Sequence, residues 1–167
     1  MLTTSNIVLA ITTITSALVA GLLFGYSCSV NPGLAKLSDE QYIAAMQSIN
    51  RVIQNPVFFA CFFGTLFLLP YCAYLHYGQP VSMRFSLILA ATIIYAVTVI
   101  GITAFGNVPL NETLDKFDLD SATQAAKAAA RADFEKAWNS LHAIRTFFSV
   151  ITLLLMVIAC LSGEVKK

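Results

Sequence analysis

The sequence contains few charged residues. Only 11% of its 167 residues are charged, whereas 57% are hydrophobic, and soluble domains usually carry about 25% charged residues. The formal net charge is only +1, and the chain has no basic stripe or nucleic-acid-binding motif. These features exclude a nucleic-acid partner and an ordinary soluble domain. Membrane lipid is the expected partner of so apolar a chain.

Metal ligands and phosphate-binding motifs are also scarce. The four cysteines stand alone in apolar segments and form no Cys-x-x-Cys or Cys/His pattern. The two histidines, His76 and His142, are expected at opposite ends of the protein, where they cannot bind one ion together. No glycine-rich phosphate loop and no serine-nucleophile motif occur. The sequence therefore predicts neither a metal site nor a bound cofactor.

Long apolar stretches are the main feature that remains. They lie at about 7–30, 57–77, 85–105 and 143–161, and about 20 apolar residues suffice for a helix to cross a bilayer. The first stretch has no basic residues before it and no clean cleavage site after it, so we expect a retained transmembrane helix rather than a signal peptide. The sequence predicts one all-α membrane domain over residues 1–167, built as a four-helix transmembrane bundle.

Two further helical segments are predicted outside the membrane. Ser38 and Gln41 form a capping box before an amphipathic helix at about 39–54. Ser121 and Gln124 form a second capping box before an alanine-rich extension at about 121–142, which continues into the last apolar stretch. These two segments are expected to cap one end of the bundle. The residues 163–167 are expected to cap the last helix and to place lysines at the interface.

Four crossings place both termini on one side of the membrane and both longer loops on the other. Polar residues near the loop-side ends of the apolar stretches then gather at one end of the bundle, which we call the mouth. They are Asn31, Arg51, Asn55, Asn107, Asn111, Trp138, His142 and Arg145. On a helix, Trp138, His142 and Arg145 share one face, because their spacing is i, i+4 and i+7. Most Lys and Arg residues lie in the two longer loops, and by the positive-inside rule this favours a cytoplasmic location for these loops. Many of those charges belong to predicted helices, however, so the orientation stays open.

Three motifs at this mouth resemble one family. Asn-Val-Pro-Leu-Asn at 107–111, Trp138 with His-Ala-Ile-Arg-Thr at 142–146, and Asn31-Pro-Gly followed by Asn55-Pro56 are together similar to the anthrone oxygenase-like membrane proteins. The resemblance covers nearly the whole chain and implies a four-helix membrane protein, expected in a bacterial cell membrane. Characterised members oxidise an anthrone to an anthraquinone with molecular oxygen, without metal or flavin. The resemblance thus implies a small aromatic substrate and oxygen as partners, although most bacterial members are a domain of unknown function.

The residues at the mouth suit such an oxidation. Removing a proton from the CH2 group between two aromatic rings gives an electron-rich anion that reacts with oxygen directly. His142 is the candidate base, because an imidazole ordinarily titrates near pH 6.5. The candidate donors to the developing oxyanion are Arg145, Asn107 and Asn111. The candidate substrate-binding residues are Trp138, Asn31, Asn55 and Arg51.

Each of these residues also has a structural interpretation. Arg145 near a helix end can extend to water as an anchor, His142 can hydrogen-bond a carbonyl group, and Trp138 can belong to an interfacial belt. Asn55 before a proline suits a helix N-cap, and the pair Asn107 and Asn111 suits a turn. The alternative hypothesis is therefore a small non-enzymatic membrane protein that binds a lipid or a partner at its mouth. The sequence is compatible with a homo-oligomer in either case.

Overall fold

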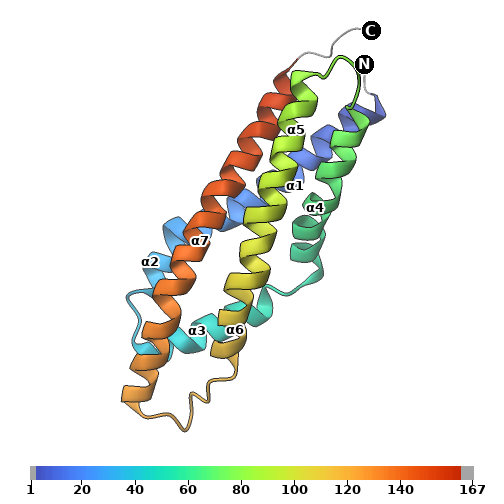
Figure 1. The fold of residues 1–167 in the computed structure, drawn as a ribbon. Coiled ribbons are helices and arrows are strands. Elements are labelled where there is room, and N and C mark those ends of the chain that lie inside the picture. Colours follow the sequence, from blue (N-terminus) through green and yellow to red (C-terminus); the bar gives the residue numbers. More distant parts are fainter. Residues whose placement is uncertain (1–2, 163–167) are drawn as a thin grey trace.

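The computed structural model describes residues 3–162, and among these residues it contains helices and no strand (Figure 1). Four helical spans are long and apolar enough to cross a membrane: Thr4–Leu34, Pro56–Leu75, Met83–Asp115 and Gln124–Leu161. We call them spans one to four. The all-α fold with four apolar spans is thereby confirmed. The predicted cap at 163–167 lies outside the described residues.

The spans combine α-helices with short π-helical turns. Span one joins α1 (Thr4–Gly25), a π-helical turn (Tyr26–Val30) and α2 (Asn31–Leu34). Span two is α4 (Pro56–Leu75), and α3 (Asp39–Val52) precedes it. Span three joins α5 (Met83–Ile94), two π-helical turns (Tyr95–Gly101 and Thr103–Asn107) and α6 (Val108–Asp115). Span four is a single helix, α7 (Gln124–Leu161).

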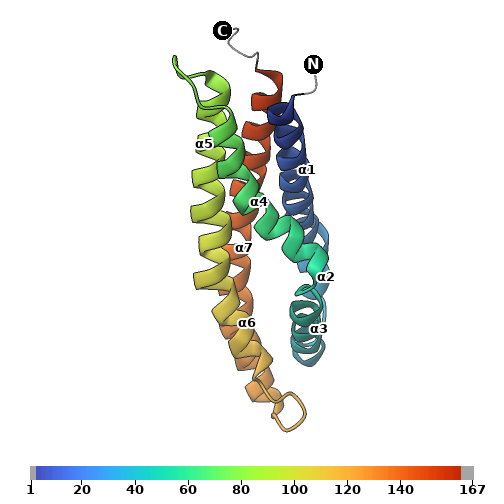
Figure 2. The ribbon, with the colours of Figure 1, turned by 90° about the vertical axis from the view of Figure 1, so that its right-hand side faces the viewer.

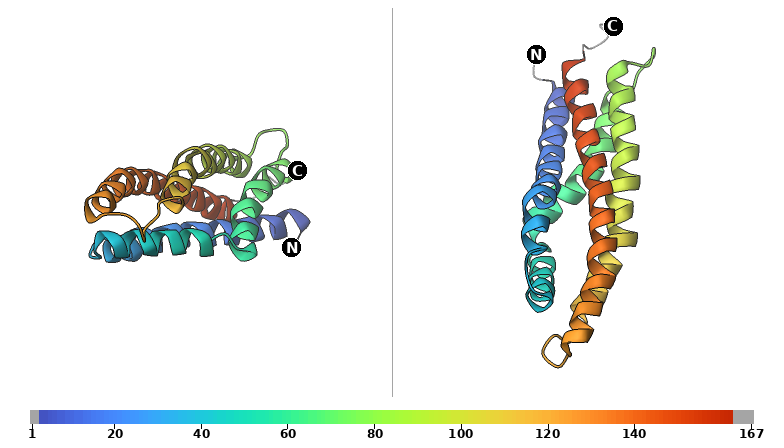
Figure 3. Two further views of the ribbon diagram at one scale, coloured as in Figure 1. Left: turned by 90° about the horizontal axis from the view of Figure 1, so that it is seen from below. Right: turned by 90° about the vertical axis from the view of Figure 1, so that its left-hand side faces the viewer.

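The start of α1 and the end of α7 lie together at one end of the bundle, and α3 and α6 lie at the other (Figure 1). α7 packs along both α1 and α5, and α4 crosses the bundle obliquely (Figure 2). Seen from the loop end, α1, α2 and α3 form one layer, and α7 with span three forms a second (Figure 3). The predicted mouth therefore lies between two helical layers.

Two predicted helix ends are wrong, because the helix continues through them. The first and third stretches were predicted to end at about 30 and 105, but Asn31-Pro32-Gly33 lies within span one and the segment 107–111 lies within span three. In both places a π-helical turn directly precedes the proline-containing segment. A proline removes one i→i−4 hydrogen bond, and a π-helical turn shifts neighbouring hydrogen bonds to i→i+5. The shifted pattern lets the helix pass the proline without ending.

The capping box of α3 is confirmed. The hydroxyl of Ser38 accepts the backbone N–H of Gln41, whose side chain accepts the N–H of Ser38. The second predicted capping box is wrong, since Thr123 caps α7 and the Ser121 hydroxyl instead donates to Asp118. The 38 residues of α7 measure about 57 Å. Nearly half of α7 therefore extends beyond a hydrocarbon core of about 30 Å.

Two ion pairs attach α3 to the extramembrane half of α7. Lys127 Nζ lies 2.9 Å from Glu40 Oε2, and Arg131 Nη1 lies 3.1 Å from Asp39 Oδ1. The hydrogen bond from Lys127 holds the pKa of Glu40 below its usual value. Arg131 also donates to two carbonyl groups just after α2, where a cation suits the helix dipole. These contacts fix the cap over the mouth.

Two apolar clusters fill the bundle. The membrane-side cluster packs residues of α4, α5 and α7 together, among them Leu69, Ile88 and Met156. The cap cluster joins α3 to α7 through Tyr42, Ile43, Met46, Phe134 and Trp138. Because Trp138 belongs to this buried cluster, it is not a residue of an exposed interfacial belt. Along α7, His142, Arg145 and Thr146 lie between the residues of the two clusters.

Candidate functional site

α7 brings Trp138, His142 and Arg145 into direct contact at the mouth. His142 is 1% exposed and Trp138 is 3% exposed. The imidazole and indole rings stack at a centroid distance of 4.8 Å and an interplanar angle of 11°. The guanidinium carbon of Arg145 lies 5.4 Å from the centroid of the same indole, within the range of a cation–π contact. We call these three residues the Trp–His–Arg cluster.

Both ring nitrogens of His142 have partners. Nδ1 lies 3.3 Å from Nε and 3.0 Å from Nη2 of Arg145. Nε2 lies 3.2 Å from the carbonyl oxygen of Leu23. A guanidinium can only donate and a carbonyl oxygen can only accept. These partners therefore assign a neutral imidazole with its proton on Nε2 and the lone pair of Nδ1 directed at Arg145.

Arg145 has only neutral partners. Besides His142 and the indole face, its Nη1 donates to the hydroxyl of Thr103 at 3.1 Å. Among residues 3–162, no carboxylate forms an ion pair with Arg145. The side chain is half-buried, and a cation withdrawn from water without a counter-ion is energetically costly. The site therefore has a positive charge that an anionic ligand would neutralise.

Two asparagines of span three position Trp138. Asn111 Oδ1 accepts the indole N–H at 2.7 Å, and Asn107 Nδ2 donates to the Trp138 carbonyl group at 3.2 Å. Asn107 is fully buried, and its Oδ1 has no donor within the described part of the chain. The amide donor of Asn107 is therefore committed to the backbone of α7.

Residues of span one complete the surroundings of His142. The ring of Tyr26 packs edge-on against the imidazole at 5.2 Å and lies 5.5 Å from the indole of Trp138. One turn beyond His142, the hydroxyl of Thr146 donates to the His142 carbonyl group and lies 3.2 Å from the hydroxyl of Ser27. The cluster is thus bounded by aromatic rings toward the cap and by hydroxyl groups toward the membrane.

Tyr26, Thr103 and Thr146 were not among the predicted site residues. Thr146 follows His142 by one helical turn and Thr103 precedes Asn107 by one turn, so each shares a helix face with a predicted site residue. That spacing could have identified both threonines as site residues from the sequence. Tyr26 offered a weaker signal, as an aromatic residue at the loop end of the first apolar stretch.

Three predicted binding residues lie outside the cluster. The exposed side chain of Arg51 pairs with Asp115 at 2.7 Å. Asn55 caps α4, because its Oδ1 accepts the N–H of Phe58 at 3.0 Å, which confirms its structural interpretation. Asn31 is half-buried at the start of α2, and its side chain forms no hydrogen bond with the rest of the described chain. Topology placed these residues at the right end of the bundle but not in contact with His142.

Within residues 3–162, no group of three or more His, Cys, Asp or Glu side chains is placed to hold a metal ion. The polar groups that face the Trp–His–Arg cluster are amide, hydroxyl and carbonyl groups. The arrangement can therefore exchange a proton at Nδ1 of His142 and bind negative charge at Arg145.

Comparisons with known proteins identify the family. The anthrone oxygenase family model matches residues 58–155. The match covers more than half of the chain and contains Asn107, Asn111 and the whole Trp–His–Arg cluster, while α1, α2 and α3 lie outside it. Comparisons with curated proteins and with solved structures gave no match. The chain belongs to the anthrone oxygenase family.

Proposed function

We propose that the protein is an integral membrane oxygenase of a bacterial cell membrane that oxidises an anthrone-like or other planar phenolic compound with molecular oxygen. One observation carries the proposal. The Nδ1 lone pair of a neutral His142 is directed at Arg145, a cation that has no carboxylate partner among the described residues. A base and a group that binds negative charge are thus adjacent, beside stacked aromatic rings. Family membership supports the type of reaction, although a shared fold alone does not fix a function.

His142 and Arg145 would act together. In the free protein Arg145 donates to Nδ1 of His142, which occupies the lone pair that a base needs. A substrate oxygen that carries partial negative charge competes for the same guanidinium. Once Arg145 turns toward that oxygen, Nδ1 is free to accept a proton. Binding and activation of the base are then one event.

The proposed reaction balances without a cofactor. The CH2 carbon between the aryl rings loses a proton to Nδ1 of His142, and the electron pair moves onto the carbonyl oxygen, where Arg145 stabilises the charge. The resulting anion adds molecular oxygen at the same carbon, and the peroxide takes back the proton. Loss of water then cleaves the O–O bond and leaves a second carbonyl group. One anthrone and one oxygen molecule give one anthraquinone and one water molecule.

Oxygen uptake by the purified protein in lipid nanodiscs tests the proposal. With an anthrone, we expect uptake well above the spontaneous rate. His142→Gln should lower it by about 100- to 10,000-fold, the usual contribution of a positioned base. His76→Gln is the matched control, because His76 follows α4 at the opposite end of the bundle, and it should keep the wild-type rate. No uptake above the spontaneous rate across a panel of anthrones, or an unchanged rate in His142→Gln, contradicts the proposal.

A second candidate function is a non-enzymatic membrane protein that binds a lipid or a partner protein at its mouth. It is favoured by the saturated hydrogen bonding of His142, whose two nitrogens both have partners in the free protein. A thermal-shift screen of anthrones, quinones and lipids separates the two candidates. Stabilisation by lipids alone, together with no oxygen uptake, supports the second.

A further inference from the structure

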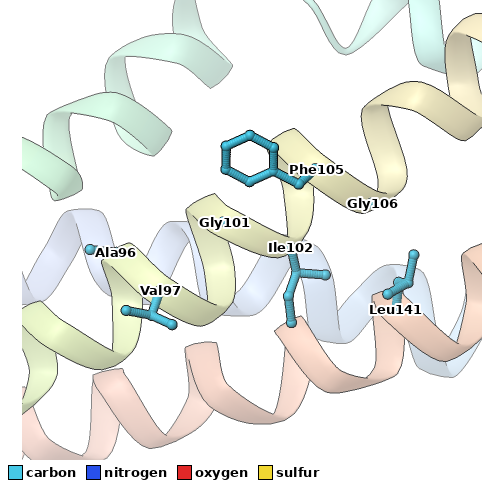
Figure 4. Close-up of a pocket in the computed structure, with 7 residues that line it drawn as sticks. All are labelled: Ala96, Val97, Gly101, Ile102, Phe105, Gly106 and Leu141. Carbon is cyan, nitrogen blue, oxygen red and sulfur yellow. The ribbon is translucent and has the colours of Figure 1, made fainter.

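Two pockets lie one beyond the other on the seam between span three and α7. The larger is a groove of about 550 Å³ (Figure 4). No charged residue lines it, and its apolar lining includes Val97, Gly101, Ile102 and Phe105 of span three and Leu141 of α7. The groove opens sideways on the outer surface of the bundle, where the Phe105 side chain is 90% exposed.

The smaller pocket, which we call the cap pocket, lies where α6 packs against the extramembrane half of α7. Its volume is about 210 Å³, and its lining includes Leu110, Thr113, Phe117 and Phe134 together with Asp133. Asp133 is its only charged residue, and this exposed carboxylate forms no ion pair within residues 3–162. The Thr113 hydroxyl donates to the Pro109 carbonyl group, so its oxygen can still accept a hydrogen bond.

The groove and the cap pocket follow the same helix faces. On span three, Leu110 of the cap pocket comes about one helical turn after Gly106 of the groove. On α7, Ala137 lies four residues after Asp133 and four before Leu141, so the three residues share a face. Ala137 is exposed. On this face of α7, therefore, only a methyl group stands between the two pockets.

The two pockets lie at different depths of a bilayer. Tyrosines gather at membrane interfaces, and the exposed Tyr77 contacts Phe85 at a ring-centroid distance of 5.3 Å, so Phe85 marks the interface at the end where α5 begins. Gly101 lies 16 residues beyond Phe85 and Thr113 lies 28 residues beyond it, which is about 24 and 42 Å along span three. A bilayer measures about 30 Å across its hydrocarbon core and about 40–45 Å with its head groups. The groove therefore lies among the acyl chains of the loop-side leaflet, and the cap pocket lies at the level of its head groups.

We propose that this seam is a specific site for a phospholipid with a primary ammonium head group, such as phosphatidylethanolamine. An acyl chain lies in the groove, and the ammonium group donates hydrogen bonds to the Asp133 carboxylate and the Thr113 hydroxyl oxygen in the cap pocket. The proposal goes beyond the oxidation proposed above and does not depend on it. An acidic lipid or an aromatic anion finds no cation among the residues that line the two pockets. A quaternary ammonium head group has no N–H group to donate.

Four single substitutions separate the two halves of the site. Asp133→Asn removes the charge of the cap pocket, and Glu112→Gln is its control, because Glu112 is an exposed carboxylate of α6 that lines neither pocket. Gly101→Leu fills the groove without a clash at its base, since a Cβ atom there would meet only the Ala96 carbonyl oxygen at 3.6 Å. Gly21→Leu is its control, because a Cβ atom at this exposed position of α1 has no atom within 4 Å. Both glycine substitutions gain similar helix propensity.

Native mass spectrometry measures which lipids the full-length protein retains when it is released from nanodiscs. The nanodiscs contain equal amounts of dioleoyl phosphatidylethanolamine, phosphatidylcholine and phosphatidylglycerol. The wild type should retain phosphatidylethanolamine about fivefold more often than phosphatidylglycerol, the scale of one exposed ion pair, and also more often than phosphatidylcholine. Asp133→Asn should lose this preference, and Glu112→Gln should keep it. Gly101→Leu should lose most of the retained lipid of every head group, and Gly21→Leu should retain lipid like the wild type.

Three results overturn the proposal. Equal retention of phosphatidylethanolamine and phosphatidylglycerol by the wild type, or an unchanged preference in Asp133→Asn, shows that the carboxylate does not select the head group. Equal retention of phosphatidylethanolamine and phosphatidylcholine contradicts the primary ammonium group. Lipid retention that is unchanged in Gly101→Leu shows that no acyl chain fills the groove. Asp133 and Glu112 are exposed, so both variants should fold like the wild type, and their thermal midpoints check this.

Discussion

Arg84 and Arg145 are withdrawn from water at opposite ends of the bundle, and their neighbours differ in kind. Arg84 is 7% exposed and donates to the carbonyl groups of Ala159 and Ser162 at the end of α7 and to Oδ1 of Asn6. The last carbonyl groups of a helix lack intrahelical donors and carry partial negative charge. Arg145 instead contacts a neutral imidazole, a hydroxyl group and an indole face.

The difference separates a structural cation from a functional one. The charge of Arg84 is stabilised by the carbonyl groups at the end of α7. Arg84 therefore joins the start of α5 to the end of α7 and to the start of α1. The charge of Arg145 is stabilised only by neutral groups, one of which is the candidate base. An intramembrane arginine is therefore interpreted from its partners, because the residue type is the same in the two places.

The largest expected effect is a loss of turnover when Arg145, but not Arg84, is replaced. Arg145→Gln should lower oxygen uptake by about 100- to 1,000-fold, as the loss of an oxyanion donor usually does, and should weaken substrate binding at the same time. The thermal midpoint should stay the same or rise, because a cation without a counter-ion is removed. A variant that loses stability but keeps its turnover would place Arg145 in the structural class with Arg84.

Arg84→Gln should show the opposite behaviour. Hydrogen bonds from a charged donor contribute about 1.5–3 kcal/mol, so the thermal midpoint in nanodiscs should fall by several degrees. Oxygen uptake per folded molecule should not change. Arg84→Lys should recover part of the stability, since an ammonium group also suits a helix C-terminus. A normal midpoint in Arg84→Gln would show that the end of α7 does not need the cation.

A smaller effect is expected when the Trp138 indole loses the hydrogen bond that fixes its orientation. It tests whether ligand binding near Arg145 depends on that orientation. Asn111→Leu removes the acceptor of the Trp138 N–H and leaves a buried donor without a partner, at a cost of about 1–3 kcal/mol. Dihydroxyanthrone binding should weaken, and the Trp138 emission should shift. Asn111→Asp keeps an acceptor and should restore both. If binding stays unchanged in Asn111→Leu, Asn111 does not position Trp138 for the ligand.

The smallest effect concerns the cap, which covers only the Arg145 end. The pKa of Glu40 is held below its ordinary value of 4.5 by Lys127. The unfolded chain therefore binds a proton more readily, so the pair stabilises the protein above about pH 4.5 and this contribution is lost as the pH falls through the lowered pKa. The Glu40 carboxylate is exposed to water, so the effect is small. Thermal midpoints measured against pH should fall less steeply on acidification in Glu40→Gln than in the wild type or in Glu112→Gln.

Much of the fold could be predicted because hydropathy and helix periodicity are local. The four apolar stretches and the capping box before α3 follow from residues close together in the chain. The errors at Pro32 and Pro109 have a common cause. The rule that proline ends a helix assumes α-helical hydrogen bonding, and the π-helical turns at Tyr26–Val30 and Thr103–Asn107 change that bonding.

Side-chain contacts in the candidate site could be predicted where one helix supplies both partners. Trp138, His142 and Arg145 contact one another because helix geometry fixes their spacing. The Leu23 carbonyl group and the Thr103 hydroxyl group come from other spans, and their contacts depend on how the helices pack. Topology shows only which end of the bundle a residue occupies, so Asn55 and Arg51 were grouped with His142 although each has a structural partner elsewhere.

The pH dependence of ligand affinity in the absence of oxygen tests most directly whether the charge of Arg145 serves an anionic ligand. Trp138 fluorescence gives the affinity for a dihydroxyanthrone and for its fully O-methylated and C-alkylated analogue, which has no acidic proton. In the wild type, affinity for the acidic compound should rise about tenfold or more as the pH passes the ligand's own pKa. In Arg145→Gln it should stay flat, while the analogue binds both proteins alike. The same rise in both proteins would contradict the assignment of Arg145 to the ligand.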